Sequence, residues 1–191
     1  MKINRNLNLV MEVDNGDSKI FVHSMPISRQ VFDTYYLPIS KAFSAIYSQG
    51  LHTAAGPRVA KNLLRDAAKD VGIWEGPEGV ENGLFNEIRR LTNVLVPISG
   101  KGWETMVLDQ AIKNGLIDED QLSEIENSVT FFIVASAMHM AKEREAILTG
   151  AGNIWGWQIS SLNCTEFAKS LPILTEEESS GETVQASSIP H

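Results

Sequence analysis

Residues 118–148, DEDQLSEIENSVTFFIVASAMHMAKEREAIL, form the longest run of helical periodicity in the chain. Three acids, Asp118, Glu119 and Asp120, stand in its first turn, where the helix dipole favours negative charge. We therefore expect one central core helix that ends before the break at Gly150-Ala151-Gly152. Its broad apolar face consists of Leu122, Ile125, Val129, Phe132, Ile133, Ala135, Met138 and Met140.

The N-terminal region has the pattern of a β-hairpin. Leu7, Leu9, Met11 and Val13 alternate with polar residues before Asn15-Gly16, and the alternation then resumes. Asn-Gly accepts the positive φ values that a tight turn between strands requires. The pattern predicts strands at about 5–13 and 18–25.

Helical spacing between the hairpin and Pro172 predicts further helices. Pro38 should kink or divide the first of them near Leu37, because proline lacks an N–H and its ring clashes with the preceding turn. The loop after the second helix carries Trp74, which we expect at the edge of the core. The expected helices cover about 28–50, 53–72, 80–95 and 108–114, and a short one runs from Asn163 or Thr165 to Pro172.

These elements predict an α+β fold, mainly α, in which the N-terminal hairpin packs on a bundle of about five to six helices. Residues 1–174 are expected to form a single globular domain, with the hairpin at 5–25 and helices from about 28 to 172. Residues 175–191, TEEESSGETVQASSIPH, contain few apolar residues and no Lys or Arg. They cannot build a core, so we expect a disordered acidic tail.

The formal net charge of −8 opposes binding to nucleic acid or to anionic membranes unless basic residues cluster. The densest basic group, Arg58, Lys61 and Arg65, lies on one expected helix and is interleaved with acids, so a solvated helix face is favoured. One cysteine, Cys164, suits a reducing cytoplasm. The chain also lacks the apolar stretch of a signal peptide or a membrane span.

We find no motif for catalysis, for a metal or for a cofactor. Cys164 has no nearby His, and a buried structural thiol is favoured over a nucleophile. His139 and Glu143 have the i, i+4 spacing of two metal ligands, but no further His or Cys joins them, so a hydrogen-bonded pair is favoured. The Gly-Lys pair at 100–101 and the glycines at 150–152 lack the spacing of nucleotide-binding loops.

Five segments have an overall pattern of residues that resembles a known family: SRQVFDTYYLPISKAFSAIY (28–47), GPRVAKNLLRDAA (56–68), EIRRLTNVLVP (87–97), FFIVASAMH (131–139) and WGWQISSLNCTEF (155–167). In these segments the chain resembles the tail assembly chaperones of long-tailed, siphovirus-type bacteriophages. The resemblance implies an α+β protein of the host bacterial cytoplasm. Such a protein binds the tape measure protein, helps recruit tail tube subunits, and is absent from the mature virion.

The candidate partner-binding residues are Leu9 and Met11 on the hairpin, and Trp155 and Trp157. An exposed hairpin edge could join copies of the chain by strand addition, and aromatic side chains could hold an apolar client. For both tryptophans, a place in the core is favoured over contact with a client.

Two other functions stay open at this point. The chain could be a structural virion component, such as a minor tail or head–tail connector protein. It could also be an enzyme whose site is assembled from residues far apart in the sequence.

Truncation after Leu174 is expected to leave folding intact, because residues 175–191 contribute almost no apolar surface. The melting temperature of the truncated chain, followed by circular dichroism, should equal that of the full chain. A large decrease would show that the tail belongs to the folded unit.

Overall fold

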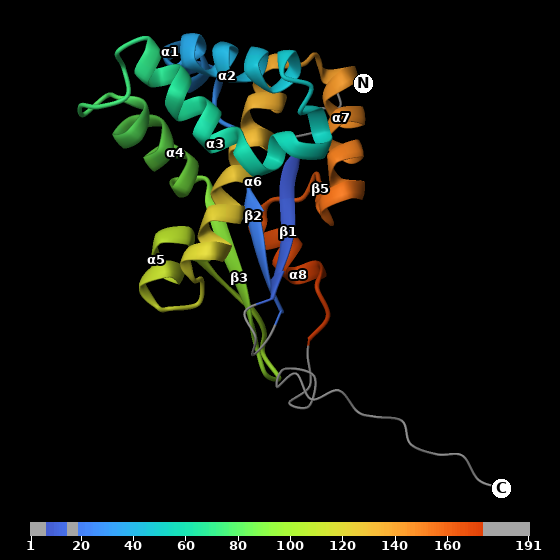
Figure 1. The fold of residues 1–191 in the computed structure, drawn as a ribbon. Coiled ribbons are helices and arrows are strands. Elements are labelled where there is room, and N and C mark those ends of the chain that lie inside the picture. Colours follow the sequence, from blue (N-terminus) through green and yellow to red (C-terminus); the bar gives the residue numbers. More distant parts are fainter. Residues whose placement is uncertain (1–6, 15–18, 174–191) are drawn as a thin grey trace, which may run out of the picture.

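The computed structural model describes residues 7–14 and 19–173, which form an α+β fold, as the sequence predicted (Figure 1). The strands are β1 (Asn8–Asp14), β2 (Lys19–Ser24), β3 (Thr92–Ile98), β4 (Gly102–Val107) and β5 (Gln158–Ser160). The helices are α1 (Arg29–Thr34), α2 (Tyr36–Ser48), α3 (His52–Asp70), the π-helix η1 (Val80–Leu84), α4 (Phe85–Arg90), α5 (Leu108–Lys113), α6 (Glu119–Met138), α7 (Ala141–Trp155) and α8 (Cys164–Ser170).

The hairpin of β1 and β2 lies inside a larger sheet. The strand order is β4-β3-β2-β1-β5, and each neighbouring pair is antiparallel. Neither strand of the hairpin is therefore an edge, and the structure has a five-stranded sheet where the sequence suggested two strands alone. The turn at Asn15-Gly16 lies outside the described residues.

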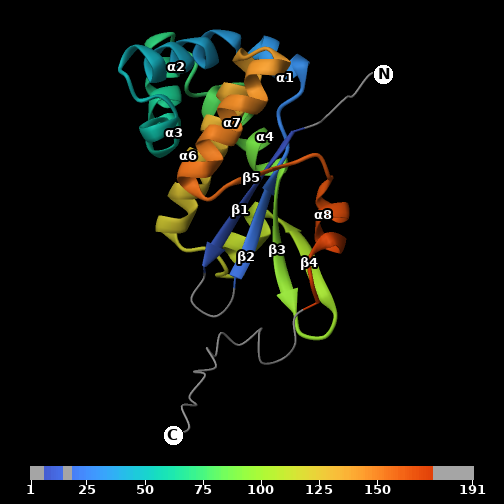
Figure 2. The same cartoon turned by 90° about the vertical axis from the view of Figure 1, so that its right-hand side faces the viewer.

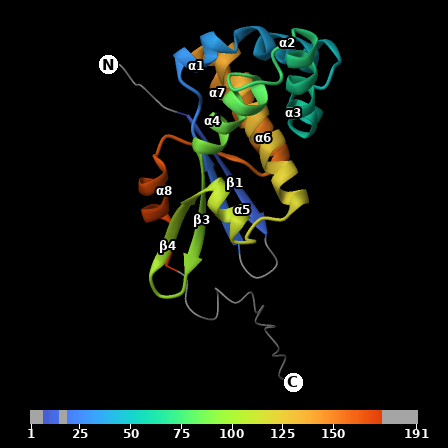
Figure 3. The same ribbon diagram turned by 90° about the vertical axis from the view of Figure 1, so that its left-hand side faces the viewer.

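The two faces of the sheet are covered by different helices (Figures 2 and 3). Because strand side chains alternate, Leu9, Met11 and Val22 face the main core, which includes α6. On the opposite face, Val10 and Leu95 pack with Phe167 of α8 in a smaller cluster. Most of the remaining helices gather at one end of the sheet, at the top of Figure 1.

The central helix is shorter than the sequence predicted. α6 ends at Met138, His139 adopts an extended backbone, and α7 begins at Ala141. α7 then continues through Gly150 and Gly152, where we expected a break. Gly152 serves close packing, because a Cβ there would lie 2.7 Å from the carbonyl oxygen of Trp157. α7 ends instead at Trp155 and is capped by Gly156, which has a φ of 71°.

Two further boundaries differ from the prediction. The helix expected at 80–95 ends at Arg90, and the β-branched and apolar run that follows forms β3, which pairs with β2 and β4. The first helix divides at Tyr35, before the position expected from Pro38, because proline is tolerated in the first turn of α2.

The acidic segment 175–191, expected to be a disordered tail, lies outside the described residues. Within residues 7–14 and 19–173, no helix combines the length and the apolar character needed to cross a bilayer.

His23 on β2 is fully buried, and its Nε2 donates to the carbonyl oxygen of Leu162 at 3.1 Å. Burial lowers the pKa of His23 below its usual 6.5, although the hydrogen bond acts in the opposite direction. As the pH falls, His23 therefore binds a proton at a higher pH in the unfolded chain than in the folded one. Lowering the pH consequently favours unfolding.

The free energy of unfolding should decrease as the pH falls below about 6.5, by up to about 1.4 kcal/mol per pH unit from this group. His23→Gln keeps a side-chain donor but cannot titrate, so denaturant titrations at several pH values should show a smaller slope. The control is His52→Asn, since His52 is exposed and its φ of 43° suits asparagine. An unchanged slope in His23→Gln would contradict the assignment.

Candidate functional site

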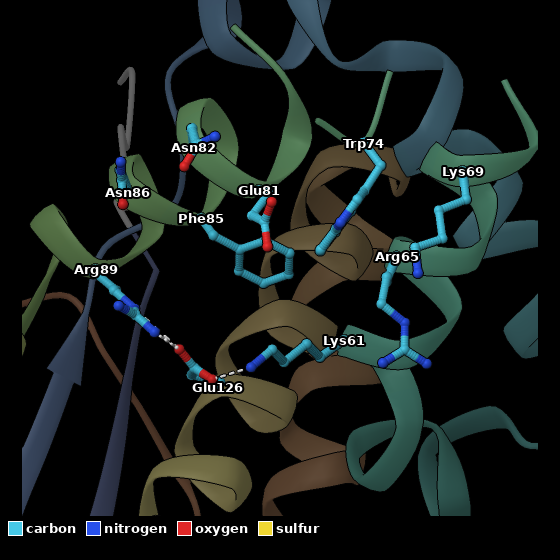
Figure 4. Close-up of a pocket in the computed structure, with 10 residues that line it drawn as sticks. All are labelled: Lys61, Arg65, Lys69, Trp74, Glu81, Asn82, Phe85, Asn86, Arg89 and Glu126. Atoms are coloured by element: carbon cyan, nitrogen blue, oxygen red, sulfur yellow. Dashed lines mark hydrogen bonds and ion pairs between the residues drawn. The ribbon is translucent and has the colours of Figure 1, made fainter. Parts of the chain in front are cut away.

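The described residues enclose a half-open pocket of about 560 Å³ between α3, the loop after it, η1, α4 and α6, which we call the Glu126 pocket (Figure 4). A pocket of this size can hold a small molecule or a few side chains of another protein. Its lining residues are Lys61, Arg65, Lys69, Trp74, Glu81, Asn82, Phe85, Asn86, Arg89 and Glu126.

Glu126 is the buried centre of the pocket, and only 3% of it is exposed. Its Oε1 accepts hydrogen bonds from Arg89 Nη2 at 2.6 Å and from Arg89 Nε at 3.0 Å. Its Oε2 accepts a hydrogen bond from Lys61 Nζ. A buried carboxylate is tolerated only when it is paired in this way, so Glu126 joins α6 to α3 and α4.

Two aromatic rings form the opposite wall. Trp74 and Phe85 meet edge to face, with their centroids 6.0 Å apart. The ammonium of Lys69 lies 5.8 Å from the Trp74 ring centroid, and that of Lys61 lies 5.7 Å from the Phe85 centroid. These cation–π contacts orient both lysines along the aromatic wall.

The cations come from a regular stripe on α3. Lys61, Arg65 and Lys69 are spaced at i, i+4 and i+8, so they lie on one face of the helix. Figure 4 shows Lys61 extending toward Glu126, with Arg65 and Lys69 on the same side of the pocket. Arg65 Nε also lies 3.2 Å from Asp66 Oδ1, in an exposed pair that a ligand could replace at little cost.

The pocket has an excess of positive charge in a chain of net charge −8. Four cationic side chains and two acidic ones line it, and Glu126 is already paired with two of the cations. This arrangement suits a ligand group that carries negative charge beside a planar or apolar part. An acidic side chain next to an apolar residue of another protein has that chemistry.

Leu9 and Met11, two of the residues predicted to bind a partner, lie on β1 in the main core. They are 0% and 3% exposed, and β1 is paired on both sides. A partner strand could add at this position only by displacing β5 or β2. The hairpin edge that suggested these residues is therefore absent from the described sheet.

Trp157 is 6% exposed and packs against Phe131, with a centroid distance of 6.2 Å. Trp155 is partly buried, and its Nε1 donates to the carbonyl oxygen of Thr53 at 2.8 Å. Pro57 has no N–H to reach that carbonyl four residues earlier, so Trp155 satisfies an acceptor that α3 leaves free. Both tryptophans have structural roles, and neither lines the Glu126 pocket.

Trp155 does line a second pocket of about 300 Å³, together with Arg58 and the polar side chains of α6. The Arg58 guanidinium lies 5.8 Å from the Trp155 ring centroid. The face of the Trp155 indole is therefore accessible to a ligand, whereas its N–H already donates to the carbonyl oxygen of Thr53.

The Glu126 pocket was not predicted, although the sequence contains one signal of it. The spacing of Lys61 and Arg65 favours a solvated face, but it continues to Lys69 and forms a basic stripe beside Trp74. Glu126 and Arg89 gave no such signal, because their contact joins residues 37 positions apart.

The other candidate groups, His139 and Cys164, lie in environments that favour a structural role. His139 Nδ1 donates to the carbonyl oxygen of Ala135 at 3.0 Å, and its Nε2 lies 3.4 Å from the hydroxyl of Tyr47. Burial raises the pKa of Cys164, which disfavours the thiolate. The described residues contain no group of three or more His, Cys, Asp or Glu side chains that could hold a metal ion.

No family model, curated protein or solved structure matches this chain.

Glu126→Gln should lower the free energy of unfolding by about 2–3 kcal/mol, as measured by denaturant titration. Breaking a fully buried pair costs roughly 3–5 kcal/mol, but Lys61 and Arg89 are 35% and 34% exposed, so solvent compensates them in part.

Glu87→Gln is the matched control, because it removes a carboxylate that is paired with the more exposed Arg90. Its effect should be clearly smaller. Equal effects of the two substitutions would show that the buried network contributes no more than a surface pair.

Proposed function

We propose that this chain is a tail assembly chaperone of a long-tailed bacteriophage, which binds the tape measure protein and helps recruit tail tube subunits during tail morphogenesis. It acts by binding and not by catalysis. The resemblance of residues 28–47, 56–68, 87–97, 131–139 and 155–167 to that family suggests the specific partners.

The Glu126 pocket is the observation that carries the proposal. Its cations and aromatic rings are the side chains that protein interfaces use to hold acidic and apolar groups of a partner. Its one buried carboxylate is held by Lys61 and Arg89, so it stabilises the pocket. Recognition is the chemistry that this arrangement supports best.

Exposed apolar side chains support the same proposal. Among the described residues, five large ones are at least half exposed: Tyr36, Leu37, Met140, Ile154 and Ile173. Tyr36 and Leu37 lie on α2, Met140 and Ile154 lie near the two ends of α7, and Ile173 follows α8. This scatter suits several weak contacts that can be released one at a time. The net charge of −8 would keep such a protein in solution while it holds a client.

In this proposal the protein works in the host bacterial cytoplasm and leaves the tail before the particle is complete. Self-association along the client is compatible with it. Nucleic acid and membranes are not partners.

Co-expression of the chain with the tape measure protein of the same phage should yield a complex that co-purifies through a tag on either partner. Arg65→Glu combined with Lys69→Glu should reduce the captured tape measure protein about tenfold, which corresponds to about 1.4 kcal/mol. Both residues line the pocket, and neither contacts Glu126 in the described hydrogen bonds and ion pairs.

The matched control is Lys41→Glu combined with Lys113→Glu. It changes the net charge equally at exposed positions outside the pocket, so capture should be unchanged. Capture of no tail component by the unaltered chain would overturn the proposed function. An equal loss of captured tape measure protein in both double variants would show that binding depends on net charge alone. The Glu126 pocket would then not be the binding site.

Mass spectrometry of purified virions separates the chaperone from a structural virion component. A chaperone should be absent or far below the amount of the tail tube protein. Stoichiometric presence in the particle would favour a minor tail or connector protein.

A further inference from the structure

Another cavity, of about 270 Å³, lies between α1 with its preceding loop and the α6–α7 turn. Its wall is mixed, with an apolar part that includes Ile27, Phe32, Ile133 and Ala137. Its polar part consists of Ser28, Arg29, Ser136 and Arg144. We call it the Ser136 cavity.

Two polar atoms of this cavity have no hydrogen-bond partner among the described residues. They are Ser136 Oγ and Arg144 Nε, and each is buried at the atomic level. Ser136 as a whole is only 5% exposed. Buried polar atoms are nearly always hydrogen-bonded, so two unpaired ones in one small cavity indicate a missing partner.

The guanidinium is held in place for this role. Arg144 Nη2 donates to the carbonyl oxygen of His139 at 3.3 Å, which anchors one end of the group at the α6–α7 turn. The Nε–H remains unused. A second arginine, Arg29, also lines the cavity, but its side chain is 80% exposed and paired with Asp33.

The chemistry of the cavity defines the ligand. The arginine is always charged and donates only, and the serine hydroxyl can donate beside it, so the ligand must supply acceptor oxygens and favours a negative charge. The apolar side chains on one part of the wall favour a ligand that also carries an aliphatic group. The volume lies just below that of pockets for drug-sized molecules, so the ligand is small.

We propose that the Ser136 cavity binds a small aliphatic carboxylate, with Arg144 Nε and Ser136 Oγ donating to the carboxylate oxygens. The same chemistry is offered by a free short-chain acid and by the C-terminal residue of a polypeptide. This site is separate from the Glu126 pocket, and the inference does not rest on the proposed function.

The test is a titration of the ¹⁵N-labelled full chain with isovalerate and with N-acetyl-leucine, which mimics a polypeptide C-terminus. Both should give saturable shifts at residues 26–32 and 133–144, with a Kd of about 1 mM for a ligand of this size. Tighter binding of isovalerate assigns the site to a free acid, and tighter binding of N-acetyl-leucine assigns it to a polypeptide end. N-acetyl-leucinamide, which lacks the charge, should bind at least about tenfold more weakly.

Ser136→Ala should weaken isovalerate at least about fivefold. It should leave the melting temperature of the ligand-free protein unchanged or higher, because it removes a hydroxyl that has no partner there. Ser128→Ala is the matched control, since Ser128 is 2% exposed on the same helix but does not line the cavity. It should not change the Kd.

Several results would overturn the inference. One is the absence of saturable shifts up to about 20 mM isovalerate, and another is equal binding of the leucinamide. A third is displacement of isovalerate by inorganic phosphate, which would change the ligand class. A lower melting temperature of ligand-free Ser136→Ala with an unchanged Kd would show that the hydroxyl is bonded within the fold.

Discussion

The complete burial of α6 between Ile125 and Ser136 is the constraint on which the rest of the structure depends. A helix enclosed on all sides must pair each of its polar groups inside the protein. Thr130 does so locally, by donating to the Glu126 carbonyl oxygen at 2.6 Å. Asn127 bonds both Ser123 of its own helix and the backbone N–H of Lys61 on α3. The polar residues of α6 therefore determine which helices lie beside it and in which register.

The same requirement for a partner inside the protein applies to the charged side chain of Glu126. Its carboxylate requires cations, and α3 and α4 supply Lys61 and Arg89 from opposite sides. The pairing separates these two helices by the width of the ion network, and Trp74 and Phe85 close the space above it (Figure 4). The Glu126 pocket is thus a consequence of burying a charged residue. At the other end of the buried run, about 15 Å along the helix, the buried hydroxyl of Ser136 has no partner among the described residues.

Several local irregularities are compensated by distant residues. Pro57 leaves the Thr53 carbonyl without its helical donor, and the indole of Trp155 replaces that donor from α7. Gly152 lets the backbone of Trp157 approach α7, which brings β5 next to β1. Each sequence signal was visible beforehand as a proline, a glycine or a tryptophan. Their pairing was not, because the partners are far apart along the chain and meet only when α6 is enclosed.

The sequence alone determined the α+β class, the pairing of residues near 8–14 with those near 19–24, and most helices, because these depend on periodicity and on local caps such as Asn163. Tertiary structure decided the rest. Residues 92–98 became a strand because β2 and β4 offered hydrogen bonds, and the long helix divided at His139 so that α7 could pack back on α6. It also moved Leu9, Met11 and Trp157 into the core and assembled the Glu126 pocket from α3, α4 and α6, since burial and ion pairing depend on neighbours that no local pattern specifies.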